Sequence, residues 1–386
     1  MKVKKILTFA FLASIFEFHL IGQNYFPPPH GFEWKKKSLE YFKINIKKLN
    51  SAIDFAKENE YRGSKDLRIA INKGFENEPY HKILGPTKKR GGPAGIILKG
   101  GYKIASWGDT KRVDMTFSVT KSYLSTIAGL AVDQKLFKTD DFVSDYIWDN
   151  SFKGKHNSKI RWKYLLNQSS DWSGTLWGIH DWADRPPKEG GIDDWKNRKL
   201  NTPGTFYKYN DVRVNLLAYC LLNVWRQPLP QVLKKFIMDP IGASTTWRWY
   251  GYNNSWVELD GNRMQSVSGG GHSGGGLFIN TEDHARFGLL FLRQGKWNER
   301  QLISQQWINK ATQSSPSQKS YGYMWWLNKK GTERYWEGVP EDTFYASGFG
   351  GNYIIIVPEK DMVVVLRWLE PTQVGVFMEK LIGALP

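Results

Sequence analysis

Two aliphatic runs near the C-terminus restrict the fold of this chain more than any other feature. Residues 353–357 read Tyr-Ile-Ile-Ile-Val, residues 362–366 read Met-Val-Val-Val-Leu, and the turn sequence Pro-Glu-Lys-Asp separates them. β-Branched runs joined by a short turn predict a β-hairpin. Neither run alternates apolar with polar residues, which is typical of central strands covered on both faces. The chain should therefore build a sheet with a layer packed on each side.

A second hairpin and several helices are predicted upstream of these strands. Residues 94–98 and 102–107 form two strand-like runs that meet at a pair of glycines. Helical periodicity predicts a helix over about 38–59, a polar helical stretch over about 140–168 and another helix over about 281–293. Strands and helices are therefore expected to be mixed along the chain.

The segment after the second hairpin brings a hydroxyl close to an amine. From Ser118 onward, apolar residues recur at the spacing of a helix with one buried face: Leu124, Ile127, Ala128 and Ala131. Residues three apart are neighbours on a helix, so the Lys121 amine can reach the Ser118 hydroxyl. A desolvated lysine loses proton affinity and can act as a base. Ser-x-x-Lys also arises by chance, so catalysis needs partners from elsewhere in the chain.

A long segment over 169–204 shows no sustained period and is rich in Trp, Asp, Gly and Pro. Such a segment is more often a lid or binding loop than a linker. Four of its tryptophans could line a pocket, although packing within the loop explains them as well: Trp172, Trp177, Trp182 and Trp195. Tyr209 then precedes another helical stripe. For Asn210 and Asp211, helix capping is at least as good an explanation as chemistry.

Two further segments are candidates for an active site. Ser347 and Gly348 lie in a glycine-rich stretch before the C-terminal hairpin, where a backbone N–H could approach a substrate, although a β-bulge is an equal alternative. The second candidate, Gly-His-Ser-Gly-Gly at 271–275, matches a nucleophile elbow. That elbow needs a helix directly after the serine and a distant histidine. Here a strand-like run follows and only His284 lies downstream, so Ser273 is a poor nucleophile candidate.

Charge and cysteine content exclude several function classes. The net charge of +17 would attract anionic partners, but the basic runs are short and scattered, which favours a solvated basic surface over nucleic-acid binding. The single cysteine, Cys220, lies among leucines and allows no intramolecular disulfide. Neither cysteine zinc patterns nor His-Glu-x-x-His occur, so we expect no metal and no cofactor.

The N-terminus resembles a secretory signal peptide. Three lysines precede an apolar run over 6–16, which is too short to span a bilayer, and we place the cleavage near Gly22. No cysteine follows the run, so no lipid anchor is expected, and no later run is long enough for a membrane span. The mature chain should therefore be exported, either periplasmic or secreted.

Three motifs together resemble those of the serine β-lactamase and penicillin-binding-protein superfamily. They are Ser-Val-Thr-Lys at 118–121, Tyr-Asn-Asp at 209–211 and Ala-Ser-Gly at 346–348, and the resemblance covers roughly 92–366. The branch that is most similar contains class C-like esterases and amidases, including 6-aminohexanoate-oligomer hydrolases. The resemblance implies an α/β (α+β) fold, with an antiparallel sheet flanked by helices and built from residues 23–117 and 261–386. A mostly helical subdomain, residues 118–260, would be inserted between them.

The resemblance also implies roles for individual residues. Ser118 would be the acylated nucleophile, Lys121 the base that activates it and Tyr209 the proton shuttle to the leaving group. The backbone N–H groups of Ser118 and Phe349 would form the oxyanion hole. The residues expected to contact substrate are Asp211, Trp172, Trp177, Ala346, Ser347 and Gly348.

Two departures from the superfamily pattern bear on the substrate. Relatives usually carry Asn where this chain has Asp211, which leaves the role of that residue open. They usually carry Lys or His where this chain has Ala346, which argues against efficient β-lactam or D-Ala-D-Ala turnover. We therefore expect an exported serine hydrolase that acts on a small neutral ester or amide. A β-lactamase or DD-peptidase, and a non-catalytic binding protein on the same scaffold, are the alternatives.

Overall fold

The computed structural model describes residues 25–329 and 335–386. The predicted signal peptide, residues 1–22, lies outside the described residues. Helices and antiparallel strands are mixed along the chain, which confirms the predicted α/β class and the β-lactamase-like architecture of sheet and flanking helices.

The main sheet has six strands in the order β11-β12-β13-β14-β1-β2, and every neighbouring pair is antiparallel. Both predicted hairpins are present, and β14 pairs with β1, so the two ends of the chain meet in one sheet. The strands are β1 (Ala94–Lys99), β2 (Tyr102–Trp107), β11 (Trp326–Leu327), β12 (Phe344–Gly348), β13 (Asn352–Val357) and β14 (Met362–Arg367).

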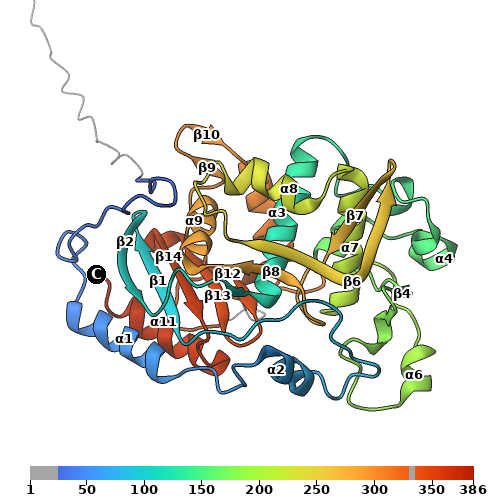
Figure 1. Ribbon diagram of the computed structural model, residues 1–386, viewed down its shortest axis with the longest axis horizontal. Coiled ribbons are helices and arrows are strands. Elements are labelled where there is room, and N and C mark those ends of the chain that lie inside the picture. Colours follow the sequence, from blue (N-terminus) through green and yellow to red (C-terminus); the bar gives the residue numbers. More distant parts are fainter. Residues whose placement is uncertain (1–24, 330–334) are drawn as a thin grey trace, which may run out of the picture.

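Helices cover both faces of this sheet, as the aliphatic runs predict (Figure 1). In β14, Val363 and Val365 face the larger core, whereas Val364 and Leu366 face a second core on the other side. Successive side chains of a strand point to opposite faces, so an unbroken aliphatic run serves two cores. The covering helices are α9 (Thr281–Leu292) on the first face, and α1 (Ile46–Glu58) and α11 (Val374–Ile382) on the second.

A second group of elements lies beside the sheet and is joined to it by α3, which is central in Figure 1. Its four-stranded sheet has the order β3-β8-β6-β7, and β7 packs on α7. The elements are η1 (Phe117–Val119), α3 (Thr120–Asp133), α7 (Asp211–Trp225), β3 (Asp114–Met115), β6 (Arg248–Leu259), β7 (Asn262–Val267) and β8 (Gly276–Ile279). The predicted subdomain boundary at 260/261 lies in the turn between the paired strands β6 and β7. The division into subdomains stays a prediction.

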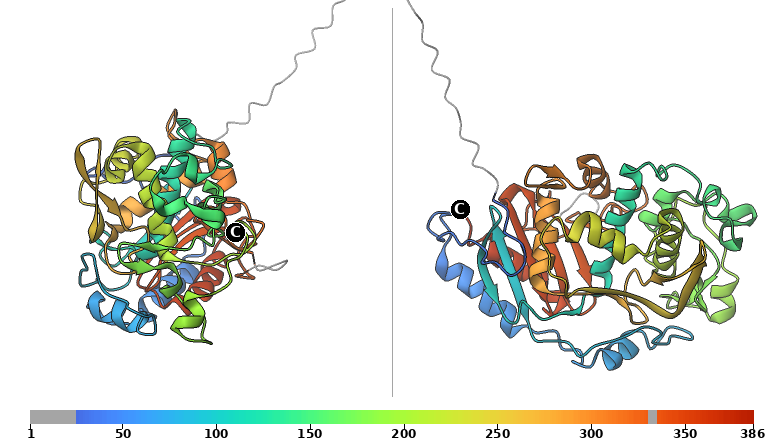
Figure 2. Two further views of the ribbon diagram at one scale, coloured as in Figure 1. Left: turned by 90° about the vertical axis from the view of Figure 1, so that its right-hand side faces the viewer. Right: turned by 45° about the horizontal axis from the view of Figure 1, so that its top comes forward.

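The shorter elements surround these two groups (Figure 2). They are α2 (Leu67–Gly74), η2 (Val143–Asp145), η3 (Asn150–Phe152), α4 (Gly154–Asn157), α5 (Trp162–Leu166), β4 (Thr175–Leu176), β5 (Ile179–His180), η4 (Asp181–Ala183), α6 (Ile192–Lys196), α8 (Leu229–Leu233), η5 (Lys234–Met238), β9 (Lys296–Trp297), β10 (Arg300–Gln301), α10 (Gln305–Ala311), η6 (Pro358–Lys360) and η7 (Pro371–Gln373).

Two helix predictions were too long. The helix expected over 38–59 begins only at Ile46, because the Asn45 side chain caps it by accepting a hydrogen bond from the Lys48 N–H at 3.0 Å. The stretch expected to be helical over 140–168 contains only four short helical pieces, and Gly154 breaks it with a φ of 88°. In the described part of the chain, none of the helices has the length and apolar character that crossing a bilayer requires.

Candidate active site

Ser118 lies in the 3₁₀ turn η1, immediately before α3. The residue before it, Phe117, is buried and has a φ of 50°, a left-handed conformation that costs a non-glycine residue about 1–3 kcal/mol. The ring of Phe117 packs on Phe349 with 5.1 Å between centroids and on Trp368 with 6.4 Å. This aromatic packing holds the strained turn in place and so fixes the direction of the Ser118 side chain.

The predicted pairing of hydroxyl and amine is present. Nζ of Lys121 donates to Oγ of Ser118 at 2.9 Å and to Oδ1 of Asp211 at 2.6 Å. The Lys121 side chain is almost entirely buried, so few waters compete for these contacts.

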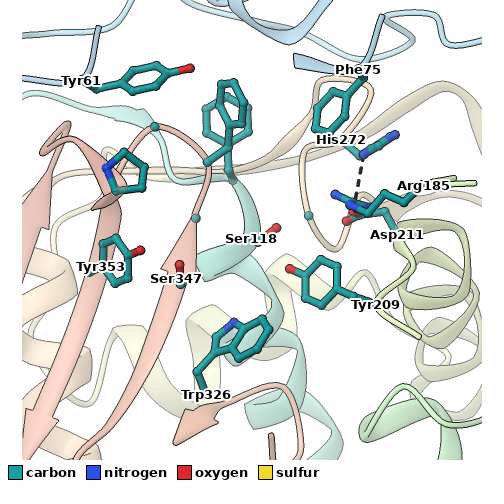
Figure 3. A pocket seen from close by; sticks show the side chains of 16 residues that line it. Tyr61, Phe75, Ser118, Arg185, Tyr209, Asp211, His272, Trp326, Ser347 and Tyr353 are labelled. Carbon is teal, nitrogen blue, oxygen red and sulfur yellow. Dashed lines mark ion pairs between the residues drawn. The ribbon is translucent and has the colours of Figure 1, made fainter. Parts of the chain in front are cut away.

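Tyr209 reaches the same point from the segment before α7. Its hydroxyl points toward Ser118 (Figure 3), and Nζ of Lys121 lies 4.7 Å from the centre of its ring. Burial and the nearby Asp211 carboxylate raise the pKa of Tyr209, although Arg185 and a hydrogen bond with Ser118 lower it in part. Tyr209 is therefore a neutral phenol at neutral pH, able to donate a proton and, as the phenolate that results, to take one back.

Asp211 is the first residue of α7 and is buried under the site. Its Oδ2 atom lies 2.8 Å from Arg185 and 3.5 Å from Nδ1 of His272. Burial alone would raise the pKa of Asp211, but the charges of Lys121, Arg185 and His272 hold it well below its usual value. The capping role considered for this motif belongs to Asn210, which accepts from the Arg213 N–H at 3.0 Å.

The third motif lies at the end of β12, against η1. A Cβ atom on Gly348 would be 2.3 Å from the Thr116 carbonyl oxygen and 3.2 Å from the Ser118 nitrogen, so only glycine fits there. Ser347, Gly348 and Phe349 line the same cavity as Ser118. The predicted oxyanion donors, the backbone N–H groups of Ser118 and Phe349, thus belong to segments that lie against each other. Their role stays a prediction.

The cavity around Ser118 measures 310 Å³, and much of its wall is aromatic. Tyr61 and Phe75 come from the N-terminal part of the chain, while Trp326 and Tyr353 come from the main sheet. Trp326 stacks on Tyr209 with 5.8 Å between ring centroids. The segments that carry the motifs thus meet at one pocket, where Ser118 and Tyr209 face each other (Figure 3) and Lys121 contacts Ser118.

A family model for beta-lactamase matches residues 105–368 of the chain. The chain belongs to the beta-lactamase family. The resemblance read from the three motifs is therefore confirmed, and the protein is a serine hydrolase.

Individual relatives are distant. A protein of Escherichia coli K12 named "Putative D-alanyl-D-alanine carboxypeptidase" is 27% identical over 326 residues, which cover 69% of this chain and 75% of that protein. The structure of a penicillin-binding protein homologue from Caulobacter crescentus has a TM-score of 0.56 at 14% identity and covers 82% of this chain and 96% of its own. EstCE1, described as a hydrolase with promiscuous acyltransferase activity, has a TM-score of 0.55 at 15% identity and covers 87% and 98%. These structures share the fold.

Three of the residues predicted to bind substrate lie elsewhere in this beta-lactamase-family protein. Trp172 is buried and its indole N–H donates to the Ser151 carbonyl at 2.7 Å, which leaves its ring in the core. Trp177 lines a neighbouring cavity of 240 Å³. Ala346 is 1% exposed and belongs to the larger hydrophobic core. None of the three is among the described residues that line the Ser118 cavity.

Sequence reasoning missed two residues of the site. Arg185 comes from the loop predicted as a lid or binding loop, lines the Ser118 cavity and contacts Asp211. His272 was considered only as part of the rival Gly-His-Ser-Gly-Gly motif, yet its ring lines the cavity too. Neither lies in a periodic element or a motif of the superfamily, so no local signal could have placed them.

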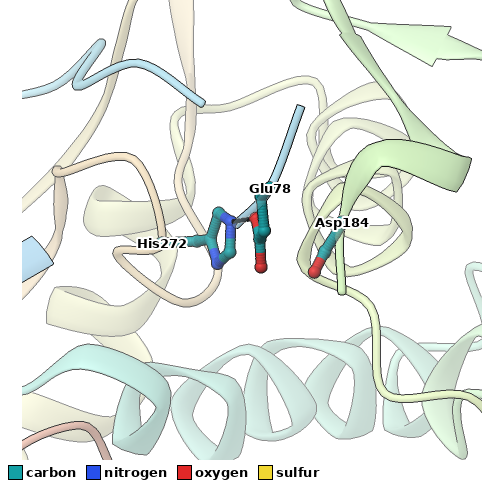
Figure 4. Close-up of side chains that lie close together, drawn as sticks. All are labelled: Glu78, Asp184 and His272. Carbon is teal, nitrogen blue, oxygen red and sulfur yellow. Dashed lines mark hydrogen bonds and ion pairs between the residues drawn. The ribbon is translucent and has the colours of Figure 1, made fainter. Parts of the chain in front are cut away.

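His272 belongs to a cluster with Glu78 and Asp184, whose ligand atoms lie within 4.8 Å of one another (Figure 4). These atoms already have partners. Nε2 of His272 lies 2.6 Å from Glu78, and Asp184 accepts from the backbone N–H groups of Asp211 and Val212. Arg185 adds a positive charge in contact with Asp184. A metal ion would have to displace these contacts beside a guanidinium, so we assign no metal to the cluster.

The rival nucleophile Ser273 lacks a base. Its hydroxyl is buried and has no hydrogen-bond partner within residues 25–329 and 335–386. Strand β8 follows it, not the helix that a nucleophile elbow requires. The two nitrogens of His284 are bound to the hydroxyls of Thr116 and Tyr123 at 2.7 and 2.8 Å. The glycine-dense segment therefore shapes the Ser118 site and does not form a second one.

Proposed function

We propose that this serine hydrolase cleaves an ester or amide through an acyl-enzyme on Ser118, with Lys121 and Tyr209 transferring the protons. The observation that supports this most is the 2.9 Å contact between Nζ of Lys121 and Oγ of Ser118 in a nearly dry environment. A serine hydroxyl is a weak nucleophile until a neighbouring base takes its proton.

In the acylation step, Oγ of Ser118 forms a bond to the carbonyl carbon and its proton moves to the Lys121 amine. The negative charge that develops on the carbonyl oxygen would be stabilised by the backbone N–H groups of Ser118 and Phe349. The bond to the leaving group then breaks. The leaving group takes a proton from the Tyr209 hydroxyl, which is replenished from Lys121.

In the deacylation step, a water molecule adds to the acyl carbon and gives a proton to the Lys121 and Tyr209 pair. The bond between that carbon and Oγ breaks, and the proton returns to Ser118. The acid leaves and the enzyme is restored. No cofactor is needed for either step.

The lining of the cavity supports a small neutral substrate. The walls are largely aromatic, which suits an apolar acyl or alcohol group. The third motif, outside this lining, carries the buried Ala346 where relatives carry Lys or His. The E. coli relative named as a putative D-alanyl-D-alanine carboxypeptidase keeps amide cleavage as a candidate beside ester cleavage. Export, inferred from residues 1–22, is part of the proposal.

The test is a comparison of wild type with Ser118→Ala. The two proteins are assayed with p-nitrophenyl esters, a chromogenic cephalosporin and short amides, and both are treated with a fluorophosphonate. We expect the wild type to turn over an ester and to gain one covalent label, and the variant to do neither. Undiminished hydrolysis by the variant would rule out the mechanism.

The same screen separates the alternatives. Rapid acylation by the cephalosporin would favour a β-lactamase or DD-peptidase. Retention of a ligand by a wild-type protein that hydrolyses none of the esters or amides would favour a binding protein.

A further inference from the structure

We propose that Asp211 is a positioning residue that acts through Lys121, holding the amine on Ser118 and stabilising the ammonium that forms when Lys121 takes the serine proton. The inference rests on the proposed function and deepens it. Asp211 was expected to contact substrate, but its surroundings give it a different task.

Both carboxylate oxygens of Asp211 lie within ion-pair distance of a basic side chain, and Oδ1 also accepts a hydrogen bond, whereas Oδ2 has no hydrogen-bond partner among the described residues. Oδ1 accepts from Nζ of Lys121 at 2.6 Å, and Oδ2 lies 2.8 Å from Arg185. The side chains of Asp211 and Lys121 are 3% and 2% exposed, so water replaces neither partner. A carboxylate also has no N–H to offer a substrate carbonyl, unlike the Asn that relatives usually carry at this place. Asp211 therefore serves the lysine.

The backbone of Gly270 packs closely against the ion pair of Lys121 and Asp211. A Cβ atom on Gly270 would lie 2.0 Å from Oδ1 of Asp211 and 2.3 Å from Nζ of Lys121. The amine cannot swing away on that side, because backbone fills the space. Nζ of Lys121 instead contacts its two hydrogen-bond acceptors, Oγ of Ser118 and Oδ1 of Asp211.

Asp184, Arg185 and His272 surround the Asp211 residue on the side away from Lys121. Asp184 accepts hydrogen bonds from the backbone N–H groups of Asp211 and Val212, which anchors the first turn of α7. Arg185, from the loop before α6, lies 2.8 Å from Oδ2, and His272, from the loop before β8, lies 3.5 Å from it. The groups that face Asp211 are thus Lys121, Arg185 and His272, with the Tyr209 phenol and the Asp184 and Glu78 carboxylates next to them.

The chemistry follows from charge. When the proton moves from Oγ of Ser118 to the Lys121 amine, a positive charge appears 2.6 Å from the Asp211 carboxylate, whose pKa Arg185 and His272 lower in addition to Lys121. An opposite charge at this distance favours the ammonium. Arg185 acts on the same carboxylate from the other side and moderates that attraction. Removing the Asp211 carboxylate and removing the Arg185 guanidinium should therefore shift the pH dependence of the reaction in opposite directions.

The experiment compares the pH dependence of kcat/KM for p-nitrophenyl acetate in wild type, Asp211→Asn and Arg185→Gln. Loss of the carboxylate should move the rising limb of the profile to lower pH by about one unit or more. It should also lower the plateau by about 10-fold or more, since the ammonium loses its partner. Loss of the Arg185 guanidinium should move the rising limb to higher pH. The Asp211 carboxylate then stabilises the Lys121 ammonium without an opposing positive charge.

Asp171→Asn is the matched control. It also removes a buried paired carboxylate, in contact with Arg213 at 2.8 Å, but Asp171 does not contact Lys121. We expect this variant to lose thermal stability without a shift of the limb. A purely structural role for Asp211 would give the same result in Asp211→Asn.

The outcomes are distinct from those of the proposed function. Shifts of opposite sign in Asp211→Asn and Arg185→Gln support the inference, and unshifted limbs in both overturn it even if Ser118→Ala is inactive. If Asp211→Asn does not fold, Arg185→Gln decides alone: a limb at higher pH supports the inference and an unshifted limb overturns it. Activity in Ser118→Ala would instead remove the proposed function itself.

Discussion

The Cα atom of Gly270 faces the ion pair of the active site so closely that an added methyl group would lie 2.3 Å from Nζ of Lys121. Contacts of this kind to buried charged atoms cannot relax without moving them. Gly270→Ala should therefore separate Lys121 from Ser118 or Asp211. We expect a loss of kcat on the order of 100-fold, the effect of misplacing a catalytic group by about 1 Å. Ester hydrolysis and thermal unfolding would be measured together.

Gly92→Ala is the control for this change. A Cβ at Gly92 meets nothing within 4 Å, and its backbone does not have the positive φ that favours glycine. Activity and melting temperature should both stay close to wild type. Unchanged activity in Gly270→Ala would contradict the crowded geometry.

A second prediction concerns the phenol. Tyr209→Phe should lower kcat by about 10²- to 10⁴-fold, because the leaving group loses its proton donor while Ser118 and Lys121 remain in contact. Slow labelling of Ser118 by a fluorophosphonate should persist, since that reagent carries a good leaving group. Kinetics with esters and mass spectrometry of the labelled protein check both statements.

Tyr207→Phe is the matched control for the phenol. The Tyr207 hydroxyl is buried and finds no hydrogen-bond partner in the described part of the chain. Removing an unpartnered buried hydroxyl should be neutral or slightly stabilising. Equal losses of activity in the two variants would show that the effect is general to this aromatic cluster.

The sequence predicted those features that local periodicity determines. The aliphatic hairpin specified a doubly covered sheet, and the spacing of Ser118 and Lys121 specified their contact. The charged surroundings of Asp211 could not be predicted in the same way. Arg185 and His272 lie in irregular segments and reach the site only through tertiary folding, which no period in the sequence encodes. Trp172 and Trp177 do not line the Ser118 cavity, for a related reason. An aromatic residue in a loop can serve packing as readily as binding, and sequence alone does not distinguish the two.

A third prediction concerns stability and pH. His284 is buried between Thr116 and Tyr123, and burial together with the Arg367 charge holds its pKa well below the usual value. The folded protein therefore keeps His284 neutral, whereas the unfolded chain binds a proton below about pH 6.5. The unfolded state then binds more protons, so stability falls as pH drops below that value. The slope should approach about 1.4 kcal/mol per pH unit.

Urea unfolding at pH 7.5, 6.5 and 5.5 measures this slope. His284→Asn removes the titrating group, so its free energy of unfolding should change less across the same range. The difference between the two slopes isolates His284 from other histidines, including His81, whose pKa burial also lowers. Parallel slopes in wild type and variant would contradict a neutral buried His284.

The last prediction concerns the ion pairs that hold the loop over 169–204. Arg213 is 1% exposed and contacts Asp171 at 2.8 Å and Asp181 at 3.1 Å, and Arg198 contacts the same two carboxylates from the loop. Arg213→Met would leave two buried carboxylates with one cation. We expect a loss of about 3–5 kcal/mol in the free energy of unfolding, as found when one partner of a buried pair is removed.

Arg226→Met tests whether burial is the cause. Arg226 is 52% exposed and pairs with Asp260, which is 51% exposed, so water screens both charges. This substitution should cost at most about 1 kcal/mol. Both variants are measured by urea unfolding at pH 7.5. Similar losses would mean that the buried network contributes no more than a surface pair, and that the loop carrying Arg185 depends on other contacts for its position.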